Sequence, residues 1–346
     1  MNIILKKDFD HIFEKYKLDL EGIKNQHVLI TGVNGMIANY LANFLSYLNS
    51  QHNFGITITG LAKKLPQNRI RDVNYLVGDI CDFNFQEHTF DHIIHSASFA
   101  SPIYYGSNPI ETSLPNIEGT INLLRRSESL MLKSFVFLSS SEVYGTFEGD
   151  KSGIDEAEYG TVDPMNQRSC YAESKRMGEN LCVSWFHQKK IPVKIIRPFH
   201  TYGPGLRKND GRVYADLIYS IVDKKDIVLN SRGEAKRAFC YMSDAIAGLL
   251  LVMLKGKSGE AYNLGNPYEE WSIFEAAIKA TQTYPDRNLK VAINESNIES
   301  AYLKSKVLRN CPAIKKIQSL GWTPDVSLLD GFRRTVQFIE FEEMTK

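Results

Sequence analysis

The stretch that decides the fold is His27-Val-Leu-Ile-Thr-Gly-Val-Asn-Gly-Met-Ile-Ala38, in which a short apolar run leads into a turn with two glycines. The residues that follow are apolar at helical spacing, so the turn opens a helix. Gly32 permits a tight turn, Gly35 lets the backbone approach a diphosphate, and Ala38 lets the helix pack against the strand. The pattern therefore predicts a dinucleotide site, although its Gly-x-x-Gly-x-x-Ala spacing leaves an ordinary strand-to-helix turn as the alternative.

Further strand-like and helical segments follow this unit along the chain. Strands are expected at 56–61, 74–77, 92–95, 135–138 and 193–196, with helical stretches between several of them, notably 107–130 and 171–189. This alternation predicts a parallel sheet with right-handed crossovers, which is a doubly wound α/β fold.

Three units are expected along the chain. Residues 1–25 form a helical extension, because residues 8–20 place their apolar side chains on one helical face. Residues 26–200 form the dinucleotide-binding domain. Residues 201–346 form mainly a smaller second lobe that is interleaved with the first domain, since an apolar helix at 245–254 can return to it.

Composition excludes several classes of protein. The 346 residues carry a formal net charge of +1, which disfavours a nucleic-acid binder, and 43% are hydrophobic, which is typical of a well-cored protein. No apolar run approaches the ~18–20 residues that span a bilayer. The five cysteines lack metal-type spacing, which indicates reduced thiols, a cytoplasmic location and no metal site.

A second candidate site begins at the strand 135–138, which ends in Ser139-Ser-Ser141. Farther along, Tyr171 and Lys175 are four residues apart, which places them on one face of a helix. An ammonium group near a phenol lowers the phenol pKa, so that the phenol can take a proton from a sugar hydroxyl while hydride leaves the same carbon. Tyr302 and Lys306 repeat the spacing without a preceding strand or serine run, and we treat that pair as a chance match.

The end of the second strand bears on the choice of cofactor. A carboxylate normally follows this strand and holds the adenosine ribose hydroxyls. This chain has Ala62-Lys63-Lys64 there instead. The two lysines favour a 2′-phosphate and therefore NADP, or they are a solvated pair of charges.

The motifs together resemble the extended short-chain dehydrogenase/reductases that act on nucleotide sugars, the NAD-dependent epimerase/dehydratase family. The resemblance covers roughly residues 26–340 and implies a Rossmann-type sheet, NAD as cofactor (with NADP possible), and a nucleotide-diphosphate sugar as substrate. The segments most similar to the UDP-glucuronate decarboxylases of this family are Ala100-Ser-Pro-Ile-Tyr-Tyr105, Ser141-Glu-Val-Tyr-Gly145, Arg168-Ser-Cys-Tyr-Ala-Glu-Ser-Lys-Arg176 and Asp210-Gly-Arg-Val213. The implied reaction is oxidation at the sugar C4, loss of CO2 and return of the hydride.

The resemblance also implies a role for individual residues. The catalytic residues are Tyr171, Lys175, Ser140 and Glu142, although Glu142 is open to a purely structural role near a strand end. The cofactor residues are Gly32, Asn34, Gly35, Met36, Ile37, Lys63, Asp79, Ile80, Ser96, Ala97, Ser98, Asn116, Tyr171, Lys175 and Pro198. The substrate residues are Ser101, Ser141, His200, Arg212, Arg237 and Tyr241. A homodimer through the helices near 107–130 and 171–189 is implied as well.

Several positions depart from the decarboxylase pattern. His200 stands where asparagine is usual, Gly205 where arginine is usual, and Phe99 where proline is usual. Two other reactions therefore stay open: NADPH-dependent reduction of a dTDP-4-keto-6-deoxy sugar, which suits Lys63 and Lys64, and nucleotide-sugar 4-epimerisation. A cofactor-binding redox sensor without catalysis is the non-enzymatic alternative.

Overall fold

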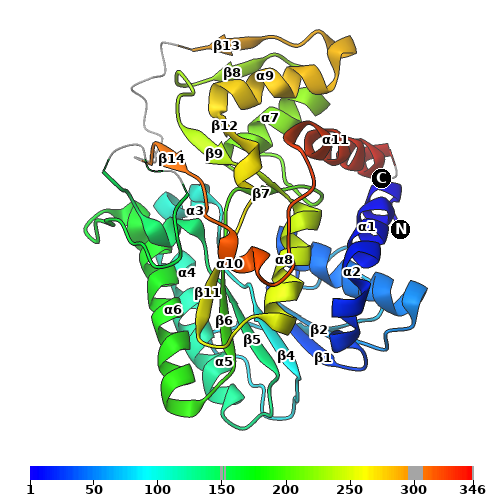
Figure 1. The fold of residues 1–346 in the computed structure, drawn as a ribbon, viewed down its shortest axis with the longest axis vertical. Helices are drawn as coiled ribbons and strands as arrows, with labels where there is room; N and C mark the ends of the chain where they lie inside the picture. The colour runs from blue at the N-terminus through cyan, green and yellow to red at the C-terminus, as the bar shows by residue number, and fades with distance from the viewer. Residues whose placement is uncertain (149–150, 152, 295–306, 345–346) are drawn as a thin grey trace.

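A seven-stranded parallel sheet forms the centre of the computed structural model, which describes residues 1–148, 151, 153–294 and 307–344. The strand order is β11-β6-β5-β4-β1-β2-β3, and Figure 1 shows the sheet in the lower half of the molecule. The strands are β1 (His27–Thr31), β2 (Thr57–Ala62), β3 (Val73–Val77), β4 (His92–His95), β5 (Ser134–Leu138), β6 (Val193–Pro198) and β11 (Glu260–Leu264). The predicted α/β fold and its first six strands are confirmed, whereas β11 was not predicted.

Each face of the sheet is covered by helices because both sets of alternating side chains are apolar. Val28 and Ile30 of β1 face α1 (Ile3–Leu20), α2 (Met36–His52) and α8 (Met242–Lys255). Leu29 points the other way, into a core shared with α5 (Thr120–Ser127) and α6 (Cys170–Lys189). Before α5 the chain forms α3 (Pro102–Ser107), α4 (Pro109–Leu114) and the π-helical turn η2 (Pro115–Gly119).

The second lobe lies above the carboxyl edge of the sheet in Figure 1 and has a core of its own. Its helices are α7 (Val213–Val222), α9 (Ile273–Thr283) and α11 (Leu328–Met344), with η5 (Pro267–Glu269) and η6 (Pro285–Arg287) between them. Its strands form two small sheets. One consists of β13 (Val291–Ile293) and β8 (Ile227–Leu229). In the other, β9 (Lys236–Ala238) lies between β12 (Glu270–Ser272) and β14 (Arg309–Asn310).

Several short elements link the two parts of the molecule. β7 (Thr201–Tyr202) pairs with β10 (Cys240–Tyr241), and the chain then enters α8 and β11, which belong to the central sheet and its helical layer. The remaining short elements are η3 (Ser141–Tyr144), η4 (Gln167–Ser169) and α10 (Lys315–Gln318). Residues 242–264 therefore rejoin the first domain beyond the expected boundary at residue 200.

The N-terminal extension is part of the core. α1 begins at Ile3, five residues before the predicted start, because the Asn2 side chain caps it by accepting from the Ile4 amide. Phe9 packs against Phe44 of α2, Ile12 is buried in the same core, and η1 (Glu21–Ile23) leads into β1. In Figure 1 both chain ends lie on one side of the molecule, where α1 meets α11.

The arrangement of the strands positions a site. The strand order reverses between β1 and β4, and in an open parallel sheet ligands bind outside the carboxyl ends of the strands at such a switch point. Within the described ranges, no helix combines the length and apolar character needed to cross a membrane.

Candidate active site

Two adjoining cavities open at the carboxyl edge of the sheet. The larger, of about 710 Å³, is lined by the turn after β1, the end of β2 and the segment after β4; we call it the glycine-turn cavity. The smaller, of about 290 Å³, is lined by the end of β5, the start of α6 and the segment after β6; we call it the tyrosine cavity. Ser96, Ser98, Ala100 and Arg212 line both, so the two cavities form one continuous site.

The turn after β1 leaves room for an anion at the start of α2. Gly32 has a φ of +68°, and a Cβ there would lie 2.7 Å from the Ala97 Cα, so only glycine fits. Gly35 is the N-cap of α2 and provides no side-chain hydrogen bond, which leaves the first helical amides available to a diphosphate. The buried side-chain oxygens of Asn34 and Ser98 have no hydrogen-bond partner in the described part of the chain. The cavity therefore suits a dinucleotide.

The two lysines at the end of β2 line the glycine-turn cavity, and one of them is already paired with a carboxylate. The Lys63 ammonium lies 2.7 Å from the Asp79 carboxylate, which comes just after β3. The same ammonium lies 5.8 Å from the centre of the Phe99 ring. Lys64 is exposed, and its carbonyl accepts from the Asn34 amide. Because Asp79 already neutralises Lys63, this edge of the cavity offers less positive charge to a 2′-phosphate than the sequence alone indicated.

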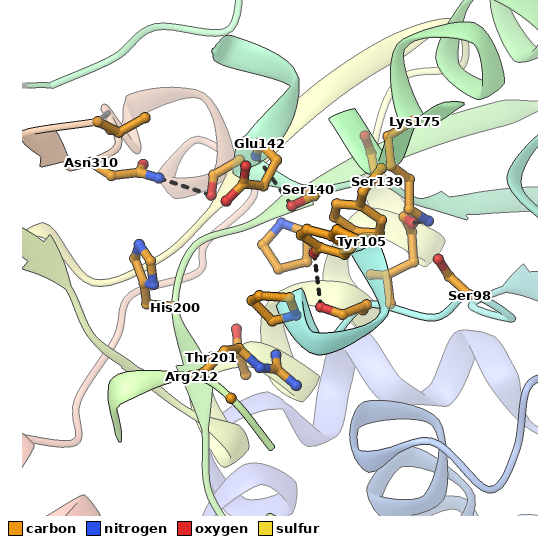
Figure 2. A pocket seen from close by; sticks show the side chains of 18 of the residues that line it. Ser98, Tyr105, Ser139, Ser140, Glu142, Lys175, His200, Thr201, Arg212 and Asn310 are labelled. Carbon is orange, nitrogen blue, oxygen red and sulfur yellow. Dashed lines mark hydrogen bonds between the residues drawn. The ribbon is translucent and has the colours of Figure 1, made fainter. Parts of the chain in front are cut away.

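Tyr171 and Lys175 lie side by side at the start of α6, as their spacing predicted. The Lys175 ammonium donates to the Leu138 carbonyl at 2.6 Å and lies 5.8 Å from the centre of the Tyr171 ring. Burial lowers the pKa of Lys175 to about 7, while the negative charge of Glu179 opposes this shift. Figure 2 shows Lys175 beside Ser139.

The expected lowering of the Tyr171 pKa is wrong. Burial raises the pKa of Tyr171 to about 12, and neither the hydrogen bond from Ser140 nor the charge of Arg212 outweighs it. The Lys175 ammonium is held by a carbonyl rather than by the phenol oxygen. Activation of the phenol therefore requires further positive charge in the site.

Tyr105 is a site residue that the sequence did not single out. Its ring stacks on that of Tyr171, with centroids 4.9 Å apart and planes 12° apart, and its hydroxyl donates to the Ala100 carbonyl at 3.0 Å. The stack fixes the plane of the catalytic ring. Tyr105 lies in the segment Ala100–Tyr105, which carried part of the family resemblance, so the sequence did point to this region. No spacing rule, however, distinguishes Tyr105 from the neighbouring Tyr104, which is exposed.

A buried ion pair lies behind the residues at the end of β5 that line the tyrosine cavity. Arg197 binds Glu179 through two nitrogens, at 2.9 and 2.6 Å, and the Ser139 hydroxyl donates to the same carboxylate at 2.5 Å. Glu179 lies one helical turn beyond Lys175. This network connects α6, β6 and the end of β5, and it fixes the wall that carries Ser139 and Ser140.

The opposite walls of the tyrosine cavity carry charged groups. Glu142 accepts a hydrogen bond from Arg168 at 3.4 Å, and Arg212 binds both carboxylate oxygens of Asp210. The Arg237 guanidinium donates to backbone carbonyls, among them that of Val307 at 2.8 Å. Figure 2 shows Ser140 and Glu142 across the cavity from His200 and Arg212.

His200 is a neutral group in this cavity. Burial and the neighbouring charges of Arg237 and Arg212 hold the pKa of His200 well below its usual range. Its buried Nε2 has no partner among the described residues. The imidazole is thus available as a hydrogen-bonding group for a ligand.

Most residues predicted from the sequence line one of the two cavities. Those around the glycine-turn cavity are Gly32, Asn34, Gly35, Met36, Lys63, Ile80, Ser96, Ala97, Ser98 and Ser101. Those around the tyrosine cavity are Ile37, Ser140, Ser141, Glu142, Tyr171, Lys175, Pro198, His200, Arg212 and Arg237. The sequence missed Tyr105, Ser139, Arg168, Thr201, Val307 and Asn310, which also line the latter cavity.

Three predicted residues line neither cavity. Asp79 points to Lys63 at the rim. Asn116 is fully buried in η2, where its amide donates to the Ser174 hydroxyl at 2.9 Å and links η2 to α6. Tyr241 is fully buried, and its hydroxyl donates to Asp8 of α1 at 2.7 Å. The expected contact of Tyr241 with a substrate is therefore wrong, because the second strand of the β7–β10 pair turns this side chain toward α1.

The chance match of Tyr302 and Lys306 lies outside the described residues. Within the described part of the chain, His, Cys, Asp and Glu side chains form no group of three that could hold a metal ion.

Comparisons with known proteins give the following similarities. Residues 28–265 match the model of the NAD dependent epimerase/dehydratase family. UDP-glucuronic acid decarboxylase 1 of Xenopus tropicalis is 31% identical over 328 residues, which are 92% of this chain and 73% of that protein. UDP-glucuronic acid decarboxylase 6 of Arabidopsis thaliana is 30% identical over 311 residues, which are 89% of this chain and 87% of that protein.

Solved structures share the fold. An epimerase from Methanothermobacter thermautotrophicus superposes with a TM-score of 0.80 at 21% identity, covering 96% of this chain and 97% of that one. UDP-glucuronic acid 4-epimerase from Bacillus cereus, in complex with UDP-glucuronic acid and NAD, superposes with a TM-score of 0.75 at 22% identity. The superposition covers 91% of this chain and 99% of that one.

Proposed function

Because this chain belongs to the NAD-dependent epimerase/dehydratase family, we propose that it is a UDP-glucuronate decarboxylase that acts through a 4-keto intermediate. One observation carries the proposal: Ser140, Glu142, Tyr171 and Lys175 line a single cavity that is continuous with the glycine-turn cavity. The names of the relatives at 30–31% identity support the same reaction.

NAD is the cofactor of this family, and the glycine-turn cavity suits it. Gly32 and Gly35 would face the diphosphate at the start of α2, while Ala97 and the unpartnered Ser98 hydroxyl would line the path toward Tyr171. When bound, NAD would supply a hydride acceptor for the sugar C4, and its oxidised ring would bring a positive charge to the site.

The first chemical task falls to Tyr171, which takes the proton of the sugar C4 hydroxyl as that carbon is oxidised to a ketone. Ser140 would donate to the reacting oxygen, and the Lys175 ammonium, 5.8 Å from the centre of the Tyr171 ring, would stabilise the phenolate. Because burial raises the pKa of Tyr171 to about 12, positive charge beside the phenol favours proton transfer near neutral pH.

The second task is loss of CO2. A ketone at C4 makes the C6 carboxylate part of a β-keto acid, so the C5–C6 bond breaks and its electron pair forms an enolate. Glu142 is the carboxyl group of the cavity that would take up a proton from solvent and deliver it to C5, in place of the lost CO2. Tyr171 then gives its proton back to the C4 oxygen, and the product is a UDP-pentose.

The test is incubation of the purified protein and NAD with UDP-glucuronate, followed by mass detection of UDP-pentose and CO2. We expect both products in equal amounts. A product of unchanged mass without CO2 would identify a 4-epimerase instead. Consumption of NADPH with dTDP-4-keto-6-deoxyglucose, and no reaction of UDP-glucuronate, would identify a reductase.

The reductase is the weaker alternative because Asp79 already pairs with Lys63 at 2.7 Å. The redox-sensor alternative is weaker still, since the tyrosine, lysine, serine and glutamate of the catalytic set share one cavity.

We propose, finally, that the enzyme is a cytoplasmic homodimer with no nucleic-acid or membrane partner. Exposed apolar side chains lie on the helices predicted to pair, among them Ile110 of α4 and Met177 of α6, which are 67% and 48% exposed. Light scattering should give the mass of two chains, and a monomer would contradict the dimer.

A further inference from the structure

His200 offers the tyrosine cavity a hydrogen-bonding group that the protein itself does not use. The residue lines this cavity, and its Nε2 is buried without a hydrogen-bond partner in the described part of the chain. A buried polar atom without a partner costs free energy, which a ligand recovers by bonding to it. The proposed chemistry gives this imidazole no task, which leaves it for binding.

The backbone of His200 is strained. Its φ of +23° lies outside the regions that residues with side chains usually adopt, so the conformation costs free energy. The strain is maintained by the β7–β10 pair, because the His200 carbonyl accepts from the Cys240 amide at 3.2 Å and Thr201 begins β7. Such strain concentrates at ligand-binding and catalytic positions, which is a second indication that the imidazole serves a ligand.

Two guanidinium groups act on this imidazole. Arg212 is the N-cap residue of α7 and lines both cavities, while Arg237 belongs to β9 and lines the tyrosine cavity. Their charges, together with burial, hold the pKa of His200 well below its usual range. Asp210 binds Arg212 through both carboxylate oxygens, but it does not cancel this effect on His200.

The other groups near the imidazole leave this positive field in place. Glu142 of η3 acts on Arg237. The Cys240 thiol is uncharged, because burial raises its pKa well above its usual range. The ring of Phe239, with its centroid 6.4 Å from that of His200, is apolar. The imidazole is therefore neutral beside two positive charges, and an anion bound there would reverse the field that acts on it.

The imidazole lies away from the reacting carbon. Figure 2 shows His200 and Asn310 on one side of the cavity, and Tyr105 and Lys175 on the other. The Tyr105 ring is stacked on that of Tyr171. In a pyranose, the C1 atom that carries the diphosphate of a nucleotide sugar is across the ring from C4. A sugar whose C4 faces Tyr171 therefore directs its diphosphate away from the tyrosine, toward the side that carries His200.

We propose that His200 takes up a proton as the nucleotide sugar binds, and that its Nε2 then donates to an oxygen of the diphosphate. This inference rests on the nucleotide-sugar substrate of the proposed function, but not on decarboxylation. The proton comes from solvent and returns there when the product leaves. The negative charge of the diphosphate favours the protonated imidazole, and an imidazolium donates a stronger hydrogen bond to an anion than a neutral group does.

The experiment measures proton uptake by calorimetry at pH 6.5 in PIPES and in ACES, two buffers that differ in their heat of ionisation. The parent protein is saturated with NAD and carries Tyr171→Phe, which stops turnover and removes the phenol as a source of protons. UDP-glucose is the ligand, because its diphosphate does not titrate near this pH and it has no carboxylate. We expect uptake of about half a proton or more per ligand, since a pKa that returns to at least 6.5 leaves His200 at least half protonated.

Variants of the parent assign the proton. His200→Asn should lower the uptake by about half a proton or more, because an amide does not titrate, and asparagine tolerates a positive φ. His200→Gln should do the same. The difference from the parent is decisive rather than the total, since Lys175 has a pKa of about 7 and can also take up a proton. His187→Gln, at an exposed position of α6, is the matched control and should keep the uptake of the parent.

The affinity for UDP-glucose gives a second measurement. Protonation favours the complex, so the affinity of the parent should rise as the pH falls below the His200 pKa in the complex, by up to about ten-fold per pH unit. The rise should be less steep in His200→Asn. An equal dependence on pH in the two proteins would contradict the proposal.

The remaining outcomes separate this inference from the proposed function. Equal uptake by the parent and His200→Asn, or no uptake by the parent, would overturn the role of His200 and leave the decarboxylation untouched. If the His200 proton is found but the enzyme with Tyr171 forms no CO2 from UDP-glucuronate, the inference stands and the proposed reaction is wrong. Failure of UDP-glucose to bind would overturn both proposals, since both place a UDP-sugar in this cavity.

Discussion

At the scale of the residue, Tyr171 carries most of the proposed chemistry. Its phenol is buried, hydrogen-bonded to Ser140 and stacked on Tyr105, and these contacts fix its position. The neighbouring ammonium of Lys175 is held by the Leu138 carbonyl, which keeps the positive charge near the ring without a direct bond to the phenol oxygen.

Tyr171→Phe should lower decarboxylation by roughly a thousand-fold, because general acid–base groups contribute about 10²–10⁴-fold. NAD binding should change less than about three-fold, since the glycine turn and Lys175 are untouched. The rate of CO2 release measures the loss of decarboxylation, and calorimetry measures the affinity for NAD. Tyr268→Phe, at an exposed position, is the matched control and should keep full activity. Normal turnover by Tyr171→Phe would contradict the mechanism.

Asp79→Asn should shift cofactor preference toward NADP. Removing this carboxylate leaves the Lys63 ammonium, now 2.7 Å from Asp79, available to a 2′-phosphate. We expect the ratio of NAD to NADP affinity to fall roughly ten-fold, the value of one charge-assisted hydrogen bond. Asp82→Asn, at an exposed site nearby, is the control. An unchanged ratio would mean that Lys63 does not face the ribose.

At the scale of the element, β4 joins the glycine turn to the helices on the far side of the sheet. His95 at its end is fully buried, and its Nε2 must donate to the Pro115 carbonyl of η2, which can only accept. Its Nδ1 therefore accepts a hydrogen bond from the Thr31 hydroxyl of β1. The oxygen of that hydroxyl in turn accepts hydrogen bonds from the backbone amides of Ser96 and Ala97. The neutral imidazole thus fixes the backbone along the glycine-turn cavity.

This burial predicts a pH dependence of stability. Burial lowers the pKa of His95 from 6.5 to about 3, so below pH 6.5 the unfolded chain takes up a proton that the folded chain does not. Stability from this group is complete above pH 6.5 and falls by up to about 1.4 kcal/mol per pH unit down to pH 3.

Urea unfolding between pH 7 and 5 measures the effect as a slope of the unfolding free energy against pH. His95→Gln should reduce that slope, whatever its effect on stability at pH 7. His187→Gln, at an exposed position of α6, should leave the slope unchanged. Equal slopes for all three proteins would contradict the role of His95.

At the scale of the whole molecule, Asp8 connects the N-terminal helix to the second lobe. Its carboxylate is fully buried, lies 2.7 Å from Arg334 of α11, and accepts hydrogen bonds from Tyr40 of α2 and Tyr241 of β10. Desolvation raises the pKa of Asp8, against the opposing effects of Tyr241 and Arg334. The extension is therefore an integral part of both domains.

Asp8→Ala should lower the free energy of unfolding by about 3–5 kcal/mol, because it leaves the buried Arg334 charge and two buried hydroxyls without this partner. Asp10→Ala, which removes a half-exposed carboxylate from the same helix, should cost less than about 1 kcal/mol. Chemical denaturation measures both. A small loss for Asp8→Ala would mean that α1 is held by its apolar face alone.

How much of the sheet could be predicted depends on the strand. β1 and β5 are flanked by strands and buried on both faces, so each contains an unbroken run of apolar residues. β11 is an edge strand with Glu260 and Asn263 in it, and Asn263 is buried only because its side chain bonds to Tyr144 and to the Ile154 carbonyl. No local pattern distinguishes such a strand from a loop.

The sequence by itself determined what depends on neighbours along the chain: the strand, turn and helix of residues 27–52, the helical spacing of Tyr171 and Lys175, and the α/β order of elements. Only the tertiary structure decided which charged side chains form ion pairs. Lys63 meets Asp79, Arg168 meets Glu142, and Asp8 meets Arg334 from the opposite end of the chain. The physical reason is that periodicity is a property of one segment, whereas ion pairing and burial are set by which segments pack together.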